Sequence, residues 1–373
     1  MEISKVNSFI KLRTLLSVDG LGIMKILKLV DIFGSIDNLF TIDTRESRSN
    51  DKISTKLLHK LLLAQQKYKE TFSIYENEIE QVENIGAEII TYWDIQYPQQ
   101  LKNIYYPPLI LYVLGDLTEN DSQSISIVGT RTATDYGKTI ATKFTTALAK
   151  QNITIVSGMA RGIDSIAHKT ALKQNGRTLA IIGSGLDVIY PPENKSLFHK
   201  IIEHGAVISE FSLGTKPDAQ NFPKRNRIIA GISLGTLVIE TRKNGGAMQT
   251  AKHALDQNKE VFAIPGNLTS EQSNGTNTLI QRNGAKLVTN PEDILIELQL
   301  KLKPEIGINI PKPKLDLSLF EEKIYNLLDN SPKQIDKIAS ESSLSISDSL
   351  ITLLSLEFKG IVQQLPGKMF KKI

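Results

Sequence analysis

The chain has 373 residues, no cysteine and a formal net charge of +4. Its length allows two or three domains, and the lack of cysteine excludes disulfides, thiolate metal sites and cysteine nucleophiles. The small net charge excludes a histone-like polycation but allows a local basic groove. Because no run of about 18 apolar residues and no apolar signal-peptide core occur, the sequence predicts a cytoplasmic protein without a membrane partner.

The first predicted element is a helical domain over residues 1–85. Leucine and isoleucine recur at three- and four-residue spacing, with breaks at Gly20, Gly22 and Gly34. The turn GLG, an apolar helix and then FGS resemble a helix-hairpin-helix or SAM-like module, which can offer backbone N–H groups to a DNA phosphate. The segment has no concentrated basic run, so a small helical packing domain is the favoured interpretation.

Residues 86–118 are rich in tyrosine and proline, and they predict an edge strand with a covering loop. Pro98, Pro107 and Pro108 forbid a long helix. The aromatic side chains can stack on nucleic-acid bases, but we favour the core of a short connecting layer. These aromatic residues are Tyr92, Trp93, Tyr97, Tyr105 and Tyr106.

The segment 86–300 predicts an α/β domain with an extended Rossmann-like parallel sheet. Short β-branched runs alternate with helical patterns, which is typical of strands buried on both faces and joined by right-handed crossovers. Strands are expected near 125–129, 153–157, 178–182, 206–209, 236–240, 260–264 and 286–288.

Glycine-rich and basic turns are expected where these strands end, at the sheet edge where open α/β folds bind ligands. The segment NFPKRNR, which spans 221–227, is predicted to be one of these turns. Glycine lets backbone N–H groups approach a ligand closely, and the basic side chains add positive charge. The pattern therefore predicts a binding site for a polyanion at the carboxyl ends of the strands.

The carboxyl-terminal part predicts a linker and a third domain. Residues 301–314 contain three prolines and four lysines, a composition typical of an extended linker. Residues 315–373 show three helical patterns followed by a short apolar and basic tail. Three helices and a hairpin-like tail predict a winged-helix-like domain.

Motifs of common nucleotide enzymes are incomplete. YGKT at 136–139 has Thr132 where a phosphate-wrapping P-loop needs glycine. GSGLDV at 183–188 has Val188 where a dinucleotide fingerprint needs its last glycine. The five histidines lack metal-ligand spacing and an accompanying carboxylate cluster. The sequence therefore predicts no cofactor, no metal and no catalytic residue.

Taken together, the motifs resemble the DNA-processing protein A family, also called Smf. IVGTR, VSGMARGID, GSGLDVIYPPEN, NFPKRNRIIAG and FAIPGN occur in that family's order and approximate spacing, over about 90–297. The resemblance implies a non-enzymatic mediator of recombination that binds and protects single-stranded DNA. It also implies loading of the RecA recombinase, a homodimer and a role in natural transformation.

The family's binding turns map onto three segments of this sequence. The resemblance implies that backbone N–H groups and Thr130 bind phosphate, and that Arg131 pairs with a phosphate or stacks under a base. Phe222 would offer a stacking face, and Lys224 a point charge. Arg225 would brace the fold from the following helix. The predicted DNA-binding residues are Gly129, Thr130, Arg131, Gly158, Met159, Ala160, Asn221, Phe222, Lys224 and Asn226.

Two departures from the family pattern and two alternative functions remain. Gly246 stands where family members often carry serine, and Thr130 stands where some do. SLGTLVIE at 233–240 echoes the PGGxGTxxE turn of nucleotide phosphoribohydrolases of the lysine-decarboxylase-like group, in which Glu240 would be the catalytic carboxylate. The Pro-Gly-Gly is missing here, so the close backbone approach is lost. A protein scaffold with a vestigial nucleotide pocket is the other alternative.

Overall fold

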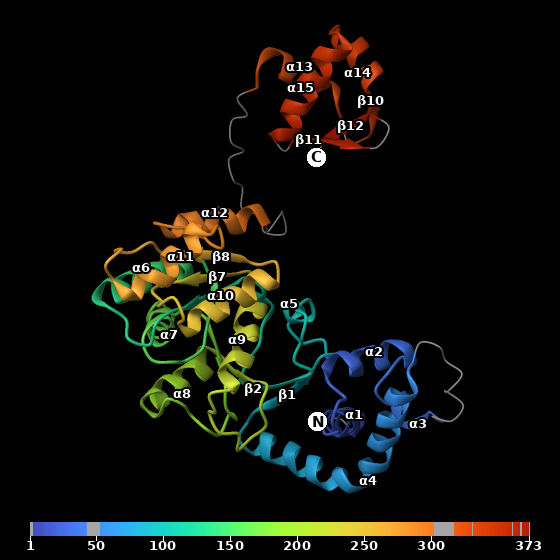
Figure 1. The fold of residues 1–373 in the computed structure, drawn as a ribbon, viewed down its shortest axis with the longest axis vertical. Helices are drawn as coiled ribbons and strands as arrows, with labels where there is room; N and C mark the ends of the chain where they lie inside the picture. Colours follow the sequence, from blue (N-terminus) through green and yellow to red (C-terminus); the bar gives the residue numbers. More distant parts are fainter. Residues whose placement is uncertain are drawn as a thin grey trace. The chain divides into compact units, whose positions relative to one another are not determined.

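The chain divides into two units, and each is described by itself. The computed structural model describes residues 3–42, 53–301, 317–329, 331–359, 361–365 and 368–372. The first unit spans Met1–Lys303 and the second spans Pro304–Ile373. Figure 1 colours both along the sequence and labels their elements. Among the described helices, none is both long and apolar enough to cross a membrane.

The predicted amino-terminal helices are confirmed. They are α1 (Ile3–Leu16), α2 (Ile23–Phe33), α3 (Asn38–Thr41) and α4 (Thr55–Asn84). Gly20 and Gly34 interrupt the helices with φ of +74° and +90°, values that residues with a side chain rarely adopt. The buried leucines and isoleucines of these helices form one apolar cluster with Ile89 and Val207 of the sheet. The helices therefore share a core with the domain that follows.

A nine-stranded sheet forms the centre of the first unit. Its order is β1-β2-β6-β5-β4-β3-β7-β8-β9, and the pairs from β6 to β9 are parallel. The strands are β1 (Glu88–Thr91), β2 (Ile110–Gly115), β3 (Ser124–Val128), β4 (Thr154–Ser157), β5 (Thr178–Ile182), β6 (Gly205–Ser209), β7 (Gly235–Val238), β8 (Glu260–Ala263) and β9 (Lys286–Leu287). The seven expected strand positions are thus occupied by β3 to β9.

Residues 86–118, the segment before the parallel strands, contribute two antiparallel strands instead of one edge strand. β1 is the edge, and β2 lies between β1 and β6. Tyr97 is buried as expected for a connecting layer, and its hydroxyl donates to the Pro108 carbonyl at 2.8 Å. Trp93, Tyr105 and Tyr106 are exposed, so the packing interpretation does not hold for them.

Helices cover both faces of the sheet (Figure 1). Neighbouring residues of one strand, such as Ile155 and Val156, point to opposite faces and belong to different apolar clusters. One face carries α6 (Asp135–Lys150), α7 (Ile163–Lys173), α8 (Lys195–His204) and α12 (Pro291–Lys301), and the other carries α5 (Gln99–Lys102), α9 (Asn221–Ile232), α10 (Gly246–Asp256) and α11 (Asn274–Gln281).

The prediction of a turn at 221–227 is wrong, because NFPKRNR forms the first two turns of α9. Buried residues recur at helical spacing from Asn221 through Arg225 to Ile228 and Ile229, so this face packs against the sheet. Pro223 is tolerated because it lies in the first turn, where its missing N–H has no partner within the helix.

The second unit has the three helices and the hairpin expected of a winged helix. Its helices are α13 (Leu319–Leu327), α14 (Ile335–Ser342) and α15 (Ile346–Phe358). Its antiparallel sheet has the order β10-β12-β11, with β10 (Lys333–Gln334), β11 (Val362–Leu365) and β12 (Met369–Lys372). Of the predicted linker, residue 301 ends α12, and 302–314 lie outside the described residues.

Candidate nucleic-acid interface

An open cleft of about 550 Å³ lies beyond the carboxyl ends of the parallel strands. It is bounded by the turns after β3 and β7 and by the amino-terminal ends of α9 and α10. A narrower pocket at the end of β5 continues it, and the two share Arg131, Ala160, Tyr190, Pro217 and Phe222. This is the sheet edge at which the sequence predicts a ligand site.

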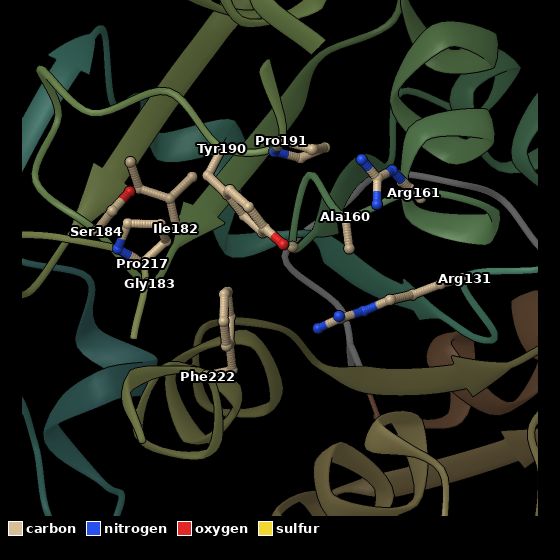
Figure 2. Close-up of a pocket in the computed structure, with 11 residues that line it drawn as sticks. Arg131, Ala160, Arg161, Ile182, Gly183, Ser184, Tyr190, Pro191, Pro217 and Phe222 are labelled. Carbon is tan, nitrogen blue, oxygen red and sulfur yellow. The ribbon is translucent and has the colours of Figure 1, made fainter. Parts of the chain in front are cut away.

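A cation and two aromatic rings converge where the cleft meets the pocket (Figure 2). The Arg131 guanidinium carbon lies 5.4 Å from the centroid of the Phe222 ring. The Tyr190 ring lies 5.9 Å from the Phe222 ring and is tilted by 43°. Arg131 is exposed and forms none of the ion pairs found among the described residues. An exposed cation thus lies over a half-buried aromatic ring in the wall shared by the cleft and the pocket.

The Arg225 side chain joins α9 to the ends of β4 and β5 by hydrogen bonds. Its buried guanidinium donates from Nη1 to the carbonyl oxygen of Gly158, at 2.6 Å, and to that of Ile181. Burial lowers the pKa of Arg225 to about 10, against the opposing effect of the Asp164 carboxylate, so the side chain is cationic at neutral pH. The bracing role expected for Arg225 therefore has a geometric basis, and it fixes the position of Phe222 on the same helix turn.

The turn after β3, at 129–131, is hydrogen-bonded to the segments that follow β4 and β7. The Thr130 N–H donates to the Glu240 carbonyl oxygen at 2.7 Å, and the Thr130 carbonyl accepts from Ile163 at 3.2 Å. The amide of Thr130 is therefore already used within the fold, which corrects the expectation that it binds a phosphate. Thr130 and Arg131 line the cleft, and the Thr130 hydroxyl also accepts from the Thr132 N–H at 3.3 Å.

The predicted site residues separate into two groups. Seven of them line the candidate site. Gly158 lines only the narrower pocket, and the six that line the open cleft are Gly129, Thr130, Arg131, Ala160, Phe222 and Asn226. Met159 lies in the apolar core, and Asn221 is buried with its amide directed to the Lys216 carbonyl at 3.3 Å. Lys224 is exposed on the first turn of α9 and lines neither cavity.

Sequence reasoning missed Tyr190 and Arg242 as lining residues. Arg242 follows β7 in the basic turn TRKNGG, so its place after a strand was a usable signal. Tyr190 lies eight residues beyond the end of β5, and no local pattern indicates that its ring returns to face Phe222.

Glu240, the catalytic residue of the alternative hydrolase, is buried and serves the fold. Its carboxylate accepts a hydrogen bond from the Thr134 backbone N–H at 3.0 Å and another from the Thr134 hydroxyl, at the start of α6. Its backbone φ is +68°. A Cβ on Gly137 would lie 2.1 Å from its Oε2, so α6 approaches this carboxylate closely.

Gly246, which stands where family members often carry serine, borders open space. Gly246 begins α10 and lines the cleft, and a Cβ placed on it would meet no atom within 4 Å. A side chain at this position would enter the cleft. The glycine therefore removes a hydroxyl from the site without being required by packing.

The fold is an α/β fold with an open cleft beyond the carboxyl ends of its parallel strands, where such folds bind ligands. The chain belongs to the DNA recombination-mediator protein A family, whose model matches residues 88–299. A second model, the DprA winged helix domain, matches residues 311–368. These matches confirm the resemblance seen in the motifs and the winged-helix expectation.

Relatives and solved structures agree with this assignment. Protein Smf of Synechocystis sp. is 37% identical over 328 residues, which cover 79% of this chain and 82% of the relative. DNA processing protein A from Streptococcus pneumoniae has a TM-score of 0.65 and 31% identity, covering 80% of this chain and 99% of that chain. DNA processing protein A from Helicobacter pylori, described for its single-stranded DNA binding mode, has a TM-score of 0.52 and 31% identity, covering 57% and 96%.

Proposed function

We propose that this chain binds single-stranded DNA in the cleft and acts without catalysis as a recombination mediator that protects the strand. The observation that carries the proposal is the exposed Arg131 guanidinium beside the Phe222 ring, 5.4 Å from its centroid. Single-strand binders combine phosphate neutralisation with base stacking on planar side chains, and this pair supplies both. Family membership and the Helicobacter pylori relative support the same ligand.

The strand form of the ligand follows from the geometry of stacking. Phe222 and Tyr190 line both the cleft and its narrower continuation. A base can enter there when it is free of a partner strand, whereas paired bases in a duplex keep their faces stacked inside the helix. Binding through this site therefore requires unpaired nucleotides.

Single-stranded oligonucleotides are expected to bind at least tenfold more tightly than blunt duplexes of the same sequence, without ATP. Fluorescence anisotropy titrations of both forms at one salt concentration measure the ratio. A duplex that binds as tightly as the single strand would move the site away from this cleft.

Arg131→Ala and Lys224→Ala are each expected to reduce the slope of log affinity against log salt by about 0.7, if each residue neutralises one phosphate. Lys173→Ala is the matched control. Lys173 is exposed in the last turn of α7, near the amino-terminal ends of the strands and away from the cleft. Anisotropy titrations over several salt concentrations give the slopes. An unchanged slope for Arg131→Ala would contradict its role in the cleft.

The wider role rests on family membership. We propose that the protein forms a homodimer, acts in the cytoplasm and loads RecA recombinase on single-stranded DNA during natural transformation. We also propose domain limits of 1–85, 86–300 and 315–373, with 301–314 as a linker. Sedimentation velocity tests the dimer, and the rate of RecA assembly on single strands tests loading. A monomer at every concentration, or an unchanged assembly rate, would contradict these roles.

A further inference from the structure

The helix of the second unit that would read DNA has the wrong chemistry for that task. In a helix-turn-helix, the second helix lies in the major groove, and its donors contact base edges while lysine and arginine contact phosphates. Here that helix is α15, with the sequence ISDSLITLLSLEF. It contains no lysine, arginine, asparagine or glutamine, and its charged residues are Asp348 and Glu357. Docking α15 on a duplex would bring carboxylates to phosphates.

The outward face of α15 is apolar. Leu353 and Leu356 are fully buried on the inward face, yet Ile351 is 67% exposed and Leu354 is 38% exposed. Residues three apart lie about 60° from each other around a helix, so Ile351 and Leu354 form one stripe. A helix that is apolar on both faces normally buries both of them. This stripe is therefore an unfilled contact surface within its unit.

The first turn of α13 is bonded to α15 and exposes two more apolar side chains. The Glu321 carboxylate accepts from the Ser355 hydroxyl at 2.6 Å and from Lys359 Nζ at 2.8 Å. Ser355 is one helical turn after Ile351, so these bonds hold the start of α13 beside the stripe. That turn exposes Leu319 by 85% and Phe320 by 60%. Leu319, Phe320, Ile351 and Leu354 are called the α13–α15 face below.

Carboxylates lie on both sides of the stripe, and Lys359, the cation on the Asp348 side, is paired with Glu321 at 2.8 Å. Around the axis of α15, Asp348 lies about 60° from Ile351 on one side, and Glu357 lies about 60° from Leu354 on the other. An apolar surface flanked in this way is complementary to an amphipathic helix whose apolar stripe is flanked by lysine or arginine. A second copy of α15 would instead oppose carboxylates with carboxylates.

We propose that the α13–α15 face binds an amphipathic helix of a partner protein, with basic residues beside its apolar stripe, and that it does not bind duplex DNA. Ridges of Ile351 and Leu354 would enter grooves between the partner's side chains, as in other helix–helix contacts. The winged helix then recruits a protein while the cleft of the first unit holds DNA. This inference goes beyond the proposed DNA site and stands independently of it.

Two synthetic helical peptides of equal length test the proposal with the full chain. Both carry the same leucine stripe, flanked by lysines in one and by glutamates in the other. We expect the lysine-flanked peptide to bind at least tenfold more tightly in anisotropy titrations. Ile351→Asp should weaken that binding at least tenfold, and the uncharged Ile351→Gln should weaken it severalfold. Ile74→Asp, at a residue 62% exposed on α4, is the matched control and should bind normally.

Circular dichroism and thermal unfolding check that the second unit of each variant is folded, and single-stranded DNA binding checks the first unit. Failure of both peptides to bind, or equal binding of the two, would overturn the proposal. So would an Ile351→Asp variant that binds the lysine-flanked peptide normally but has lost binding to a duplex oligonucleotide. That last result would assign the face to DNA.

Discussion

Gly158→Ala is expected to destabilise the protein by about 1–3 kcal/mol, the usual cost of overpacking a filled site, and to abolish tight DNA binding. A Cβ at this position would lie 2.3 Å from Arg225 Nη1 and 2.7 Å from its guanidinium carbon. To make room, the guanidinium must leave its buried position, where it is bonded to the carbonyls of Gly158 and Ile181. Displacing it breaks charge-assisted bonds and shifts the helix turn that carries Phe222.

Gly246→Ala is the matched control for this prediction. It is the same chemical change, made in the cleft that adjoins the pocket lined by Gly158, but the added Cβ meets no atom within 4 Å. Urea denaturation and anisotropy titration of both variants compare stability with binding. We expect Gly246→Ala to unfold like the wild type. If Gly158→Ala unfolds at the wild-type urea concentration and binds DNA normally, Arg225 does not organise the site.

Phe222→Ala is expected to weaken single-stranded DNA binding by about 5- to 150-fold, which corresponds to about 1–3 kcal/mol for one stacked base. The ring is half-buried at the wall shared by the cleft and its narrower pocket, so its loss removes a stacking face from both. The salt slope should stay within about 0.2 of the wild type, because a ring releases no counterion.

Tyr105→Ala is the control for loss of an exposed aromatic ring elsewhere. Tyr105 lies in the loop before β2 and lines neither part of the candidate site. Anisotropy titrations at several salt concentrations separate affinity from slope, and circular dichroism checks the fold. A Tyr105→Ala loss equal to that of Phe222→Ala would place the stacking surface on the lead-in loop. A lower slope for Phe222→Ala would show that the ring acts by arranging cations.

The strands and their turns could be predicted because each depends on local sequence. In SISIVGTR, for example, the apolar run predicts a buried strand and the following GTR predicts a turn, all within eight residues. NFPKRNR was harder, because proline and three basic residues are typical of a surface turn. Arg225 is buried only because the carbonyls of Gly158 and Ile181 lie opposite it in the fold. Because these carbonyls are distant from Arg225 in sequence, the local pattern around Arg225 does not indicate its burial.

The same limit explains the errors within the candidate site. Arg131 and Phe222 were correctly expected in one place, because both follow from the motifs that carry the family resemblance. Met159 lies between two turn residues, but its side chain points into the core. Motif membership places a residue at the sheet edge, whereas the direction of its side chain depends on the packing around it.

We expect an unpaired base of the bound strand to lie against Phe222 in the cleft. Photo-crosslinking of a single-stranded oligonucleotide containing 5-iodouracil, followed by peptide mapping, tests this position directly. We predict crosslinks to Phe222 or Tyr190, the two rings 5.9 Å apart, and their loss in Arg131→Ala at elevated salt. Crosslinks confined to Tyr105 and Tyr106, or to the winged helix, would contradict the account.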